Sequence, residues 1–328
     1  MPFLDYLNPY AYTMRLRRLA YERGWLPSYH PGIPVISVGN LTLGGTGKSP
    51  LVLLIADHLE KKHGKRVAII SRGYKRHSKG FVLVRDGKDI LALVEDSGDE
   101  AQMFAVEAPN AIVIVDEDRA RGAREAKALG AEVIVLDDGF QHLRLRRDLN
   151  ILLLGGKPSP VIPFGRMREP ESAAQAADIV IFSEGVNSVD AVDEDGRTNA
   201  IIRSVPGNIS SLEDSEVPLS NLKGKRVQAL SSIASPKGFH EMLRGLGADV
   251  IARDLGDHAD YSEALVQNIL KDAEKSNAEM IVTTMKDIVK SRKHFERAAS
   301  SIPIFILHHK REFLRGEAGF YQAIDRIL

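Results

Sequence analysis

The chain has 328 residues, of which 44% are hydrophobic and 27% charged, a composition typical of a folded protein with a sizeable core. Lysine plus arginine and aspartate plus glutamate both number 44, so the chain lacks the basic excess that nucleic-acid binders usually carry. It contains no cysteine, which excludes disulfides, thiolate metal sites and cysteine nucleophiles.

Residues 1–30 form a first, separate segment. Tyr12, Leu16 and Leu19 recur at helical spacing with arginines between them, which predicts an amphipathic helix that ends before Pro27. The arginines argue against a signal peptide, and no apolar run in the chain is long enough to span a membrane. Such a helix either lies in a membrane interface or packs on the domain, and the residues alone slightly favour packing.

From Pro34 onward, short apolar runs alternate with helical patterns, which predicts an α/β fold with a parallel sheet between layers of helices. The expected strands are Val35–Val38, Val67–Ile70, Ala111–Val115, Val133–Leu136, Asn150–Leu154 and Ile179–Phe182.

A polar stretch over residues 186–222 is predicted to be a linker or boundary. A second α/β series follows, with strands expected at Val227–Leu230, Asp249–Ala252, Met280–Thr283 and Ile304–Leu307 and a last helix at Ala318–Leu328. We therefore expect a helical segment (1–30), a first α/β domain (31–215) and a smaller α/β domain (216–328).

A glycine-rich loop, residues 39–50, lies between a predicted strand and a predicted helix, the setting that a phosphate-binding loop needs. Its central residues are Gly44, Gly45, Thr46, Gly47, Lys48 and Ser49. Backbone N–H groups of such a loop bind phosphate oxygens, with Lys48 reaching the β- and γ-phosphates and Ser49 offering a hydroxyl to Mg²⁺. Thr42 stands where the strict motif has its first glycine, which leaves an ordinary glycine-rich turn as the alternative.

Three further segments of the chain supply candidate residues. Asp137 and Asp138 end an apolar strand, where a P-loop protein holds Mg²⁺. Asp99 is a candidate base for a hydroxyl proton, although a solvated acidic turn is the simpler interpretation on its own. His258 lies between Asp257 and Asp260, which either tune its pKa or leave it a surface histidine beside a helix cap. Arg119, Arg168 and Lys286 are basic candidates to stabilise phosphate charge.

Together these segments resemble the tetraacyldisaccharide 4'-kinases of lipid A biosynthesis. The resemblance runs from about residue 35 to about residue 290 and includes the departure at Thr42. It is carried by residues 38–50, Ser71-Arg72-Gly73-Tyr74, Gly98-Asp99-Glu100, Asp118-Arg119, residues 137–142, Arg168-Glu169-Pro170, Ile233-Ala234 with Pro236, Asp257-His258, and Thr284 with Lys286-Asp287.

The resemblance implies transfer of the γ-phosphoryl group of ATP, with Mg²⁺, to the 4'-hydroxyl of a tetraacylated glucosamine disaccharide 1-phosphate. It implies a location at the cytoplasmic face of a Gram-negative inner membrane, where the N-terminal helix would dock. Asp99 would be the base paired with His258, and Arg119, Arg168 and Glu169 would line the site. Glu100, Asp137, Asp138 and Gln141 would lie on its metal and nucleotide side, and Tyr74, Lys286 and Asp287 are further candidates. We expect residues 31–215 to form a P-loop ATP-binding domain and residues 216–328 to close the active-site cleft. We also expect a monomer that binds no nucleic acid.

Two other functions compete with this one. A switch ATPase or GTPase is disfavoured because Leu43 occupies the position where membrane-partitioning ATPases often carry a second lysine, and no guanine-specifying segment is evident. A cytosolic small-molecule kinase explains the loop and the carboxylates but gives no purpose to the basic, aromatic helix.

Overall fold

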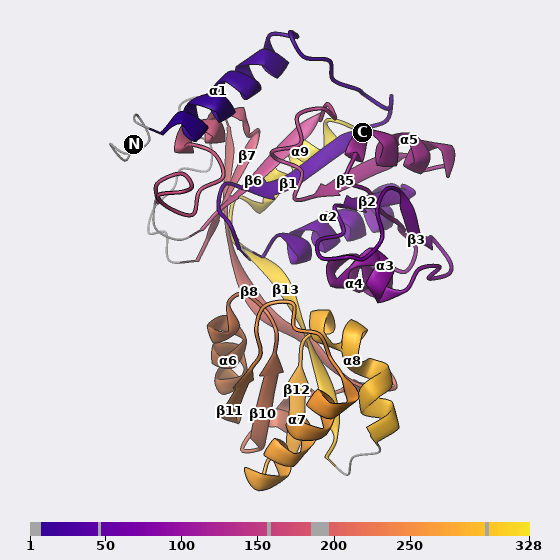
Figure 1. Ribbon diagram of the computed structural model, residues 1–328, viewed down its shortest axis with the longest axis vertical. Helices are drawn as coiled ribbons and strands as arrows, with labels where there is room; N and C mark the ends of the chain where they lie inside the picture. The colour runs from indigo at the N-terminus through magenta and orange to yellow at the C-terminus, as the bar shows by residue number, and fades with distance from the viewer. Residues whose placement is uncertain (1–7, 45–46, 156–158, 185–196, 299–301) are drawn as a thin grey trace. The chain divides into compact units, whose positions relative to one another are not determined.

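The computed structural model describes residues 8–44, 47–155, 159–184, 197–298 and 302–328. These form two compact units, which we call unit 1 (Met1–Arg203 with Arg311–Leu328) and unit 2 (Ser204–Lys310). The boundaries fall inside two long strands, β8 (Thr198–Ser211) and β13 (Ile304–Arg315), so the chain passes from one unit to the other within strands (Figure 1).

Unit 1 contains a mostly parallel sheet in the order β8-β7-β6-β1-β5-β2-β4-β3, with β3 antiparallel to its neighbour β4. Its strands are β1 (Val35–Asn40), β2 (Val67–Ser71), β3 (Val82–Asp86), β4 (Ile112–Val115), β5 (Val133–Asp137), β6 (Leu149–Leu154), β7 (Ile179–Ser183) and the start of β8. Every residue of β1, β2, β4 and β5 is buried, as expected for parallel strands covered on both faces.

The helices of unit 1 are α1 (Pro9–Glu22), α2 (Lys48–His63), α3 (Val94–Ser97), α4 (Asp99–Glu107), α5 (Arg119–Ala128), the 3₁₀ helix η2 (Glu171–Ala176) and α9 (Glu317–Asp325). α2 packs against the central strands β1, β2 and β5, and α5 packs against β2 and β4. A second apolar cluster, which includes Phe140, Leu152 and Met167, receives Ala11 from α1. Through Ala11, the N-terminal helix therefore contributes a side chain to the core of unit 1.

Unit 2 has a parallel sheet in the order β11-β10-β12-β13. Its remaining elements are β9 (Glu216–Val217), η3 (Leu219–Leu222), β10 (Arg226–Ser231), α6 (Pro236–Gly245), β11 (Asp249–Asp254), α7 (Glu263–Lys275), β12 (Met280–Thr283) and α8 (Met285–Ala298). Its core includes Val227, Ala229, Leu243 and Val282, all fully buried.

The α/β fold with a mostly parallel sheet is confirmed, but the predicted linker is wrong over residues 198–211. This stretch forms the 14-residue strand β8. Its apolar residues Ile201, Ile202 and Ile209 are buried, while most of the residues between them stay half-buried or exposed, so the average composition concealed the strand. Residues 185–196 of the predicted linker lie outside the described residues. The edge strand of unit 1, β3, was also not predicted.

Candidate active site

The loop between β1 and α2 ends on a helix N-terminus that is open to an anion. Gly47 caps α2 with a left-handed φ of 77°, and no side chain among the described residues caps the first N–H groups of this helix. Unfilled N–H groups and the helix dipole together favour a phosphate at this position. Ser49 lies on the first turn of α2 beside Lys48. Gly44 also has a positive φ, of 104°, while Gly45 and Thr46 lie outside the described residues.

Lys48 and Arg168 converge on one carboxylate. The Lys48 Nζ lies 3.2 Å from Asp138 Oδ1, and Arg168 Nη1 donates to Asp138 Oδ2 at 2.7 Å. Burial pushes the pKa of Asp138 upward, but the charges of Lys48 and Arg168 outweigh it and lower that pKa. Asp138 adopts a left-handed φ of 53°, a conformation that is costly outside glycine and concentrates at functional sites.

The position of Arg168 is set by the chain that follows β1. The Arg168 backbone N–H donates to Leu41 O at 2.6 Å, and Leu43 N–H donates to Arg166 O at 2.8 Å, so this short ladder holds residues 166–168 beside the phosphate loop. Gln141 joins the same group, since its Nε2 donates to Asn40 O at 3.0 Å and its Oε1 accepts from Arg168 Nη1 at 3.5 Å.

Asp137, the last residue of β5, is a buried carboxylate with a raised pKa. Burial raises its pKa to about 7, and the nearby Glu100 carboxylate acts in the same direction. Ser71 Oγ donates to its Oδ2 at 3.2 Å. Its Oδ1 is buried without a hydrogen bond from any residue that the structure describes. Two crowded carboxylates and an unused buried oxygen are a donor set that fits a hard dication such as Mg²⁺.

Asp99 is buried at the start of α4, so the solvated acidic turn considered from the sequence is wrong. Its Oδ1 accepts from the Glu100 N–H at 2.9 Å. Gly98 precedes it with a φ of 84°, and a Cβ there would lie 3.0 Å from Tyr74 O. Glycine thus allows the loop that contains Tyr74, itself an exposed side chain, to pack directly against the start of α4.

Arg119 begins α5 and is buried. Burial lowers its pKa, while the carboxylates of Asp138 and Asp137 act in the opposite direction, so its guanidinium lies within electrostatic reach of both. The structure therefore brings Lys48, Arg119 and Arg168 to the two aspartates at the end of β5.

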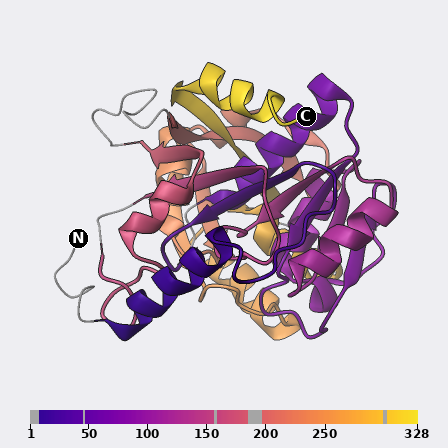
Figure 2. The same cartoon turned by 90° about the horizontal axis from the view of Figure 1, so that it is seen from above.

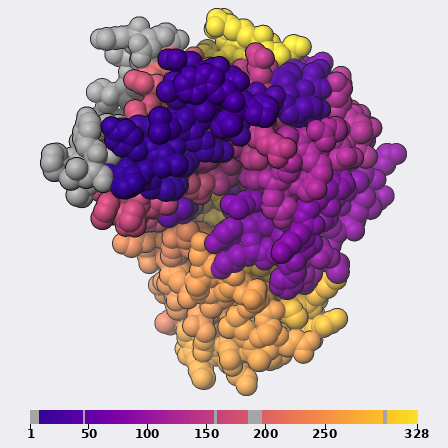
Figure 3. Space-filling model, turned by 45° about the horizontal axis from the view of Figure 1, so that its top comes forward, coloured from indigo at the N-terminus to yellow at the C-terminus, as the bar shows by residue number. Residues whose placement is uncertain are grey.

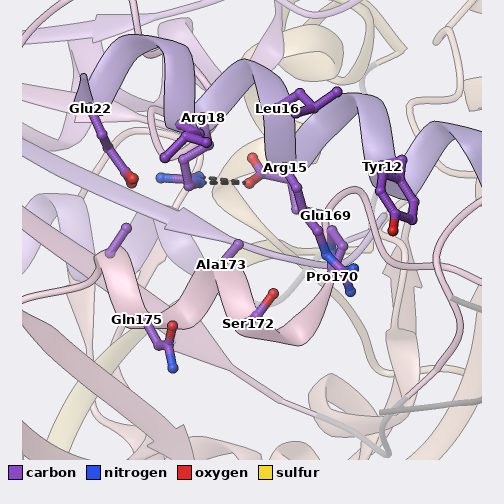
Figure 4. A pocket seen from close by; sticks show the side chains of 12 residues that line it. Tyr12, Arg15, Leu16, Arg18, Glu22, Glu169, Pro170, Ser172, Ala173 and Gln175 are labelled. Atoms are coloured by element: carbon purple, nitrogen blue, oxygen red, sulfur yellow. Dashed lines mark hydrogen bonds and ion pairs between the residues drawn. The ribbon is translucent and has the colours of Figure 1, made fainter. Parts of the chain in front are cut away.

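Glu169 has a different place from its neighbour Arg168. Its buried Oε2 accepts from Arg18 of α1, at 3.0 Å from Nε and 2.7 Å from Nη2 (Figure 4). The Arg18 guanidinium also lies over the Phe140 ring, 4.7 Å from its centroid. α1 and η2 border a cavity of about 480 Å³ beside this ion pair. Glu169 thus connects the site segment to the N-terminal helix.

The candidates of unit 2 form a group of their own. His258, with a φ of 58°, has its Nε2 3.2 Å from Lys286 Nζ and 3.8 Å from Asp257 Oδ1. Asp287 is fully buried, and its carboxylate accepts from the Tyr261 hydroxyl at 3.0 Å and from the Thr284 hydroxyl at 2.7 Å. This saturated carboxylate fixes the start of α8, which carries Lys286. Asp257 does not cap a helix, because Ser262 caps α7.

One residue that contacts the phosphate loop was missed. Arg311, on the part of β13 that belongs to unit 1, donates from Nη2 to Gly47 O at 2.9 Å. The two residues are 264 positions apart, and Arg311 lies in no motif, so no local signal in the sequence indicated this contact.

The family model described as tetraacyldisaccharide-1-P 4'-kinase matches residues 6–328 of this chain. The chain belongs to the tetraacyldisaccharide 4'-kinase family. It is 39% identical to the tetraacyldisaccharide 4'-kinase of Geobacter sulfurreducens over 304 residues, covering 88% of this chain and 83% of the relative. It is 35% identical to that of Anaeromyxobacter sp. (strain K) over 346 residues, covering 100% of this chain and 90% of the relative.

A solved structure agrees. The crystal structure of an "apo" form of LpxK from Aquifex aeolicus in complex with ATP matches with a TM-score of 0.81 and 34% identity, covering 99% of this chain and 97% of that one. The predicted family and enzyme class, a tetraacyldisaccharide 4'-kinase, are thereby confirmed. Among the described residues, no helix combines the length and apolar character needed to cross a membrane.

Proposed function

We propose that this family member transfers the γ-phosphoryl group of ATP to the 4'-hydroxyl of a tetraacylated glucosamine disaccharide 1-phosphate. The observation that carries the proposal is the convergence of Lys48 and Arg168 on Asp138 beside the open N-terminus of α2. A phosphate chain there meets backbone N–H groups and two cations, the elements that phosphoryl transfer needs. The complex of the Aquifex aeolicus protein with ATP supports the choice of nucleotide.

Asp99 is the proposed base. In this step the 4'-oxygen bonds to the γ-phosphorus, the bond from that phosphorus to the β,γ-bridging oxygen breaks, ADP leaves, and Asp99 takes the hydroxyl proton. Its burial keeps water, the competing nucleophile, away from the carboxylate. That His258 works with Asp99 stays a prediction from the resemblance. A double-mutant cycle tests it, because partners in one step give strongly non-additive losses of kcat.

Asp137, Glu100 and the Ser49 hydroxyl would hold Mg²⁺, with Asp138 close by. The unused buried Oδ1 of Asp137 supports this assignment. The ion would neutralise charge on the β- and γ-phosphates. Lys48 would exchange part of its contact with Asp138 for the phosphates, and Arg119 and Arg168 would stabilise charge that develops in the transition state. The assignment of ATP binding to residues 31–215 and of cleft closure to residues 216–328 also stays a proposal.

The N-terminal helix is proposed to meet the membrane surface where the lipid acceptor resides, at the cytoplasmic face of the inner membrane. α1 and the turn after it expose large apolar and aromatic side chains next to arginines, with Tyr12, Leu16 and Trp25 exposed by 55%, 59% and 68%. The described N-terminal part of the chain, in indigo, lies at the surface in Figure 3. This pattern fits an interfacial helix that binds anionic lipid.

Site-directed changes test this better than removal of residues 1–28, because Ala11 and Arg18 of α1 belong to the interior of unit 1. Replacing Leu16 and Trp25 by serine should weaken co-sedimentation with anionic vesicles and leave ATP binding unchanged. Leu314→Ser, at an exposed apolar position on β13, is the matched control. Vesicle binding equal to that of the wild type would refute the docking role.

The transfer reaction is tested with γ-labelled ATP, Mg²⁺ and the detergent-dispersed acceptor. We expect label in the lipid, with one ADP formed per phosphate transferred, and no label with Lys48→Ala. ATP hydrolysis without labelled lipid would instead favour a switch ATPase, and label in a water-soluble sugar but not in the lipid would favour a small-molecule kinase.

A further inference from the structure

Two histidines and a carboxylate meet at the far end of α2, away from the phosphate loop at its start. His58 Nε2 lies 3.0 Å from Asp325 Oδ1, and His63 Nε2 lies 2.8 Å from the same oxygen. The three potential ligand atoms all lie within 4.8 Å of one another. Figure 2 shows how the cluster arises: α9, in yellow, ends at the C-terminus beside α2.

The surroundings hold these side chains in place. The His58 ring stacks on the Tyr321 ring of α9, with centroids 4.2 Å apart and an interplanar angle of 22°. Tyr321 in turn packs edge-on against Phe313 and Phe320. Neighbouring groups that fix the orientation of an imidazole ligand are a usual feature around metal sites. His58 is nearly buried, whereas His63 and Asp325 are part-exposed, so the cluster is open to solvent on one side.

We propose that His58, His63 and Asp325 bind a transition-metal dication of the Zn²⁺ class. Two imidazole nitrogens and one carboxylate oxygen are typical ligands of Zn²⁺, and water from the open side would be the fourth. Imidazole ligands favour Zn²⁺, Ni²⁺ or Cu²⁺ over Mg²⁺ and Ca²⁺. In a tetrahedral Zn²⁺ site the ligand atoms lie about 3.3 Å apart, so the two histidine–aspartate separations need to open only slightly.

The site has a built-in competitor. Lys62 Nζ lies 2.7 Å from the other oxygen of Asp325, Oδ2, and so places a positive charge next to the proposed ion. The metal would tie the C-terminal end of α2 to α9. Because α2 begins at Lys48, such a link would steady the helix that carries the catalytic lysine without touching the reacting groups.

The test uses the metal-stripped full chain in excess Mg²⁺, added to compete with Zn²⁺ for the carboxylates of the proposed active site, and measures Zn²⁺ binding by calorimetry. We expect the wild type to bind one more equivalent of Zn²⁺ than His63→Gln. When Co²⁺ is added in place of Zn²⁺, the wild type should show the visible absorption bands of tetrahedral Co²⁺. His58→Gln and His63→Gln should each weaken binding by more than about 100-fold, since losing an outer-shell partner alone costs about 10–100-fold.

Two control variants separate a metal site from a plain ion-pair cluster. His30→Gln alters a histidine that pairs with the single carboxylate of Asp148, and it should leave Zn²⁺ affinity unchanged. Lys62→Gln should keep or raise the affinity, because it removes a competing cation. Equal Zn²⁺ binding by the wild type and both histidine variants would overturn the proposal, as would a Lys62→Gln loss as large as that of His63→Gln. Because no readout depends on phosphate transfer, this result is independent of the proposed function.

Discussion

Removing the Arg311 side-chain donor tests how the phosphate loop keeps its shape. Arg311 Nη2 donates to the carbonyl of Gly47, the residue that caps α2. A hydrogen bond from a charged donor contributes about 1.5–3 kcal/mol, which corresponds to roughly 10–150-fold in an equilibrium constant. If this bond holds the loop in its ATP-binding form, Arg311→Met should raise the Kd for ATP by about 10–100-fold.

The steric relation between the two residues sharpens this prediction. A Cβ on Gly47 would lie 1.5 Å from Arg311 Nη2, and the left-handed φ of 77° adds strain for any other residue. Gly47→Ala must therefore displace the Arg311 side chain. The left-handed φ of the new alanine would by itself destabilise the loop by about 1–2 kcal/mol. In Gly47→Ala combined with Arg311→Met the clash is absent, so the double variant should lose less ATP affinity than the sum of the single losses.

The assay is ATP binding by calorimetry, together with thermal unfolding to show that each variant is folded. Arg315→Met, an exposed position four residues along the same strand, is the matched control and should bind ATP like the wild type. Wild-type ATP affinity in Arg311→Met, or strictly additive losses in the double variant, would refute the proposed role of Arg311.

Three further predictions concern residues in and next to the candidate site. Asp99→Ala should lower kcat by about 10²–10⁴-fold while ATP still binds, and full retention of kcat would remove Asp99 from the role of base. Gly139→Ala should reduce the free energy of unfolding by about 1–3 kcal/mol, because the Cβ of the new alanine would lie 2.8 Å from Leu136 Cβ and from Ser37 Oγ. Chemical denaturation measures this loss, with Gly238→Ala, which has open space, as control. Burial and the charge of Arg119 lower the pKa of His142 from 6.5 to about 4. Between pH 6.5 and pH 4, His142 is therefore protonated in the unfolded chain but neutral in the folded chain. Stability should therefore fall as pH drops through this window, by up to about 2 kcal/mol more in the wild type than in His142→Gln; parallel pH profiles would contradict it.

The parts of the fold that the sequence predicted are those with strong local patterns. The runs at Val35–Val38 and Val133–Leu136 are buried on both faces, so their continuous apolar character sufficed to identify strands. The loop before Lys48 directly follows the first of these strands, and Asp137 and Asp138 lie at the end of the second. Because the carboxyl ends of parallel strands meet at one edge of a sheet, the proximity of the phosphate loop to these two aspartates was also predictable.

The rest depended on contacts between distant parts of the chain. Nothing near Glu169 indicates that it pairs with Arg18 rather than with the phosphate site, and nothing near Arg311 indicates Gly47. β8 was missed because polar residues outnumber its apolar residues, and two of those polar residues, Asn199 and Ser210, are themselves buried. The histidine cluster depends on the packing of α9 against α2, which no local periodicity encodes.

The most direct test of the central claim is to locate the new phosphate on the lipid product by phosphorus–proton correlation NMR. We predict that the wild type, with ATP and Mg²⁺, places a single phosphate on the 4'-oxygen and that Lys48→Ala gives no product. Phosphate at another hydroxyl, or ATP turnover that leaves the acceptor unmodified, would contradict the proposed reaction.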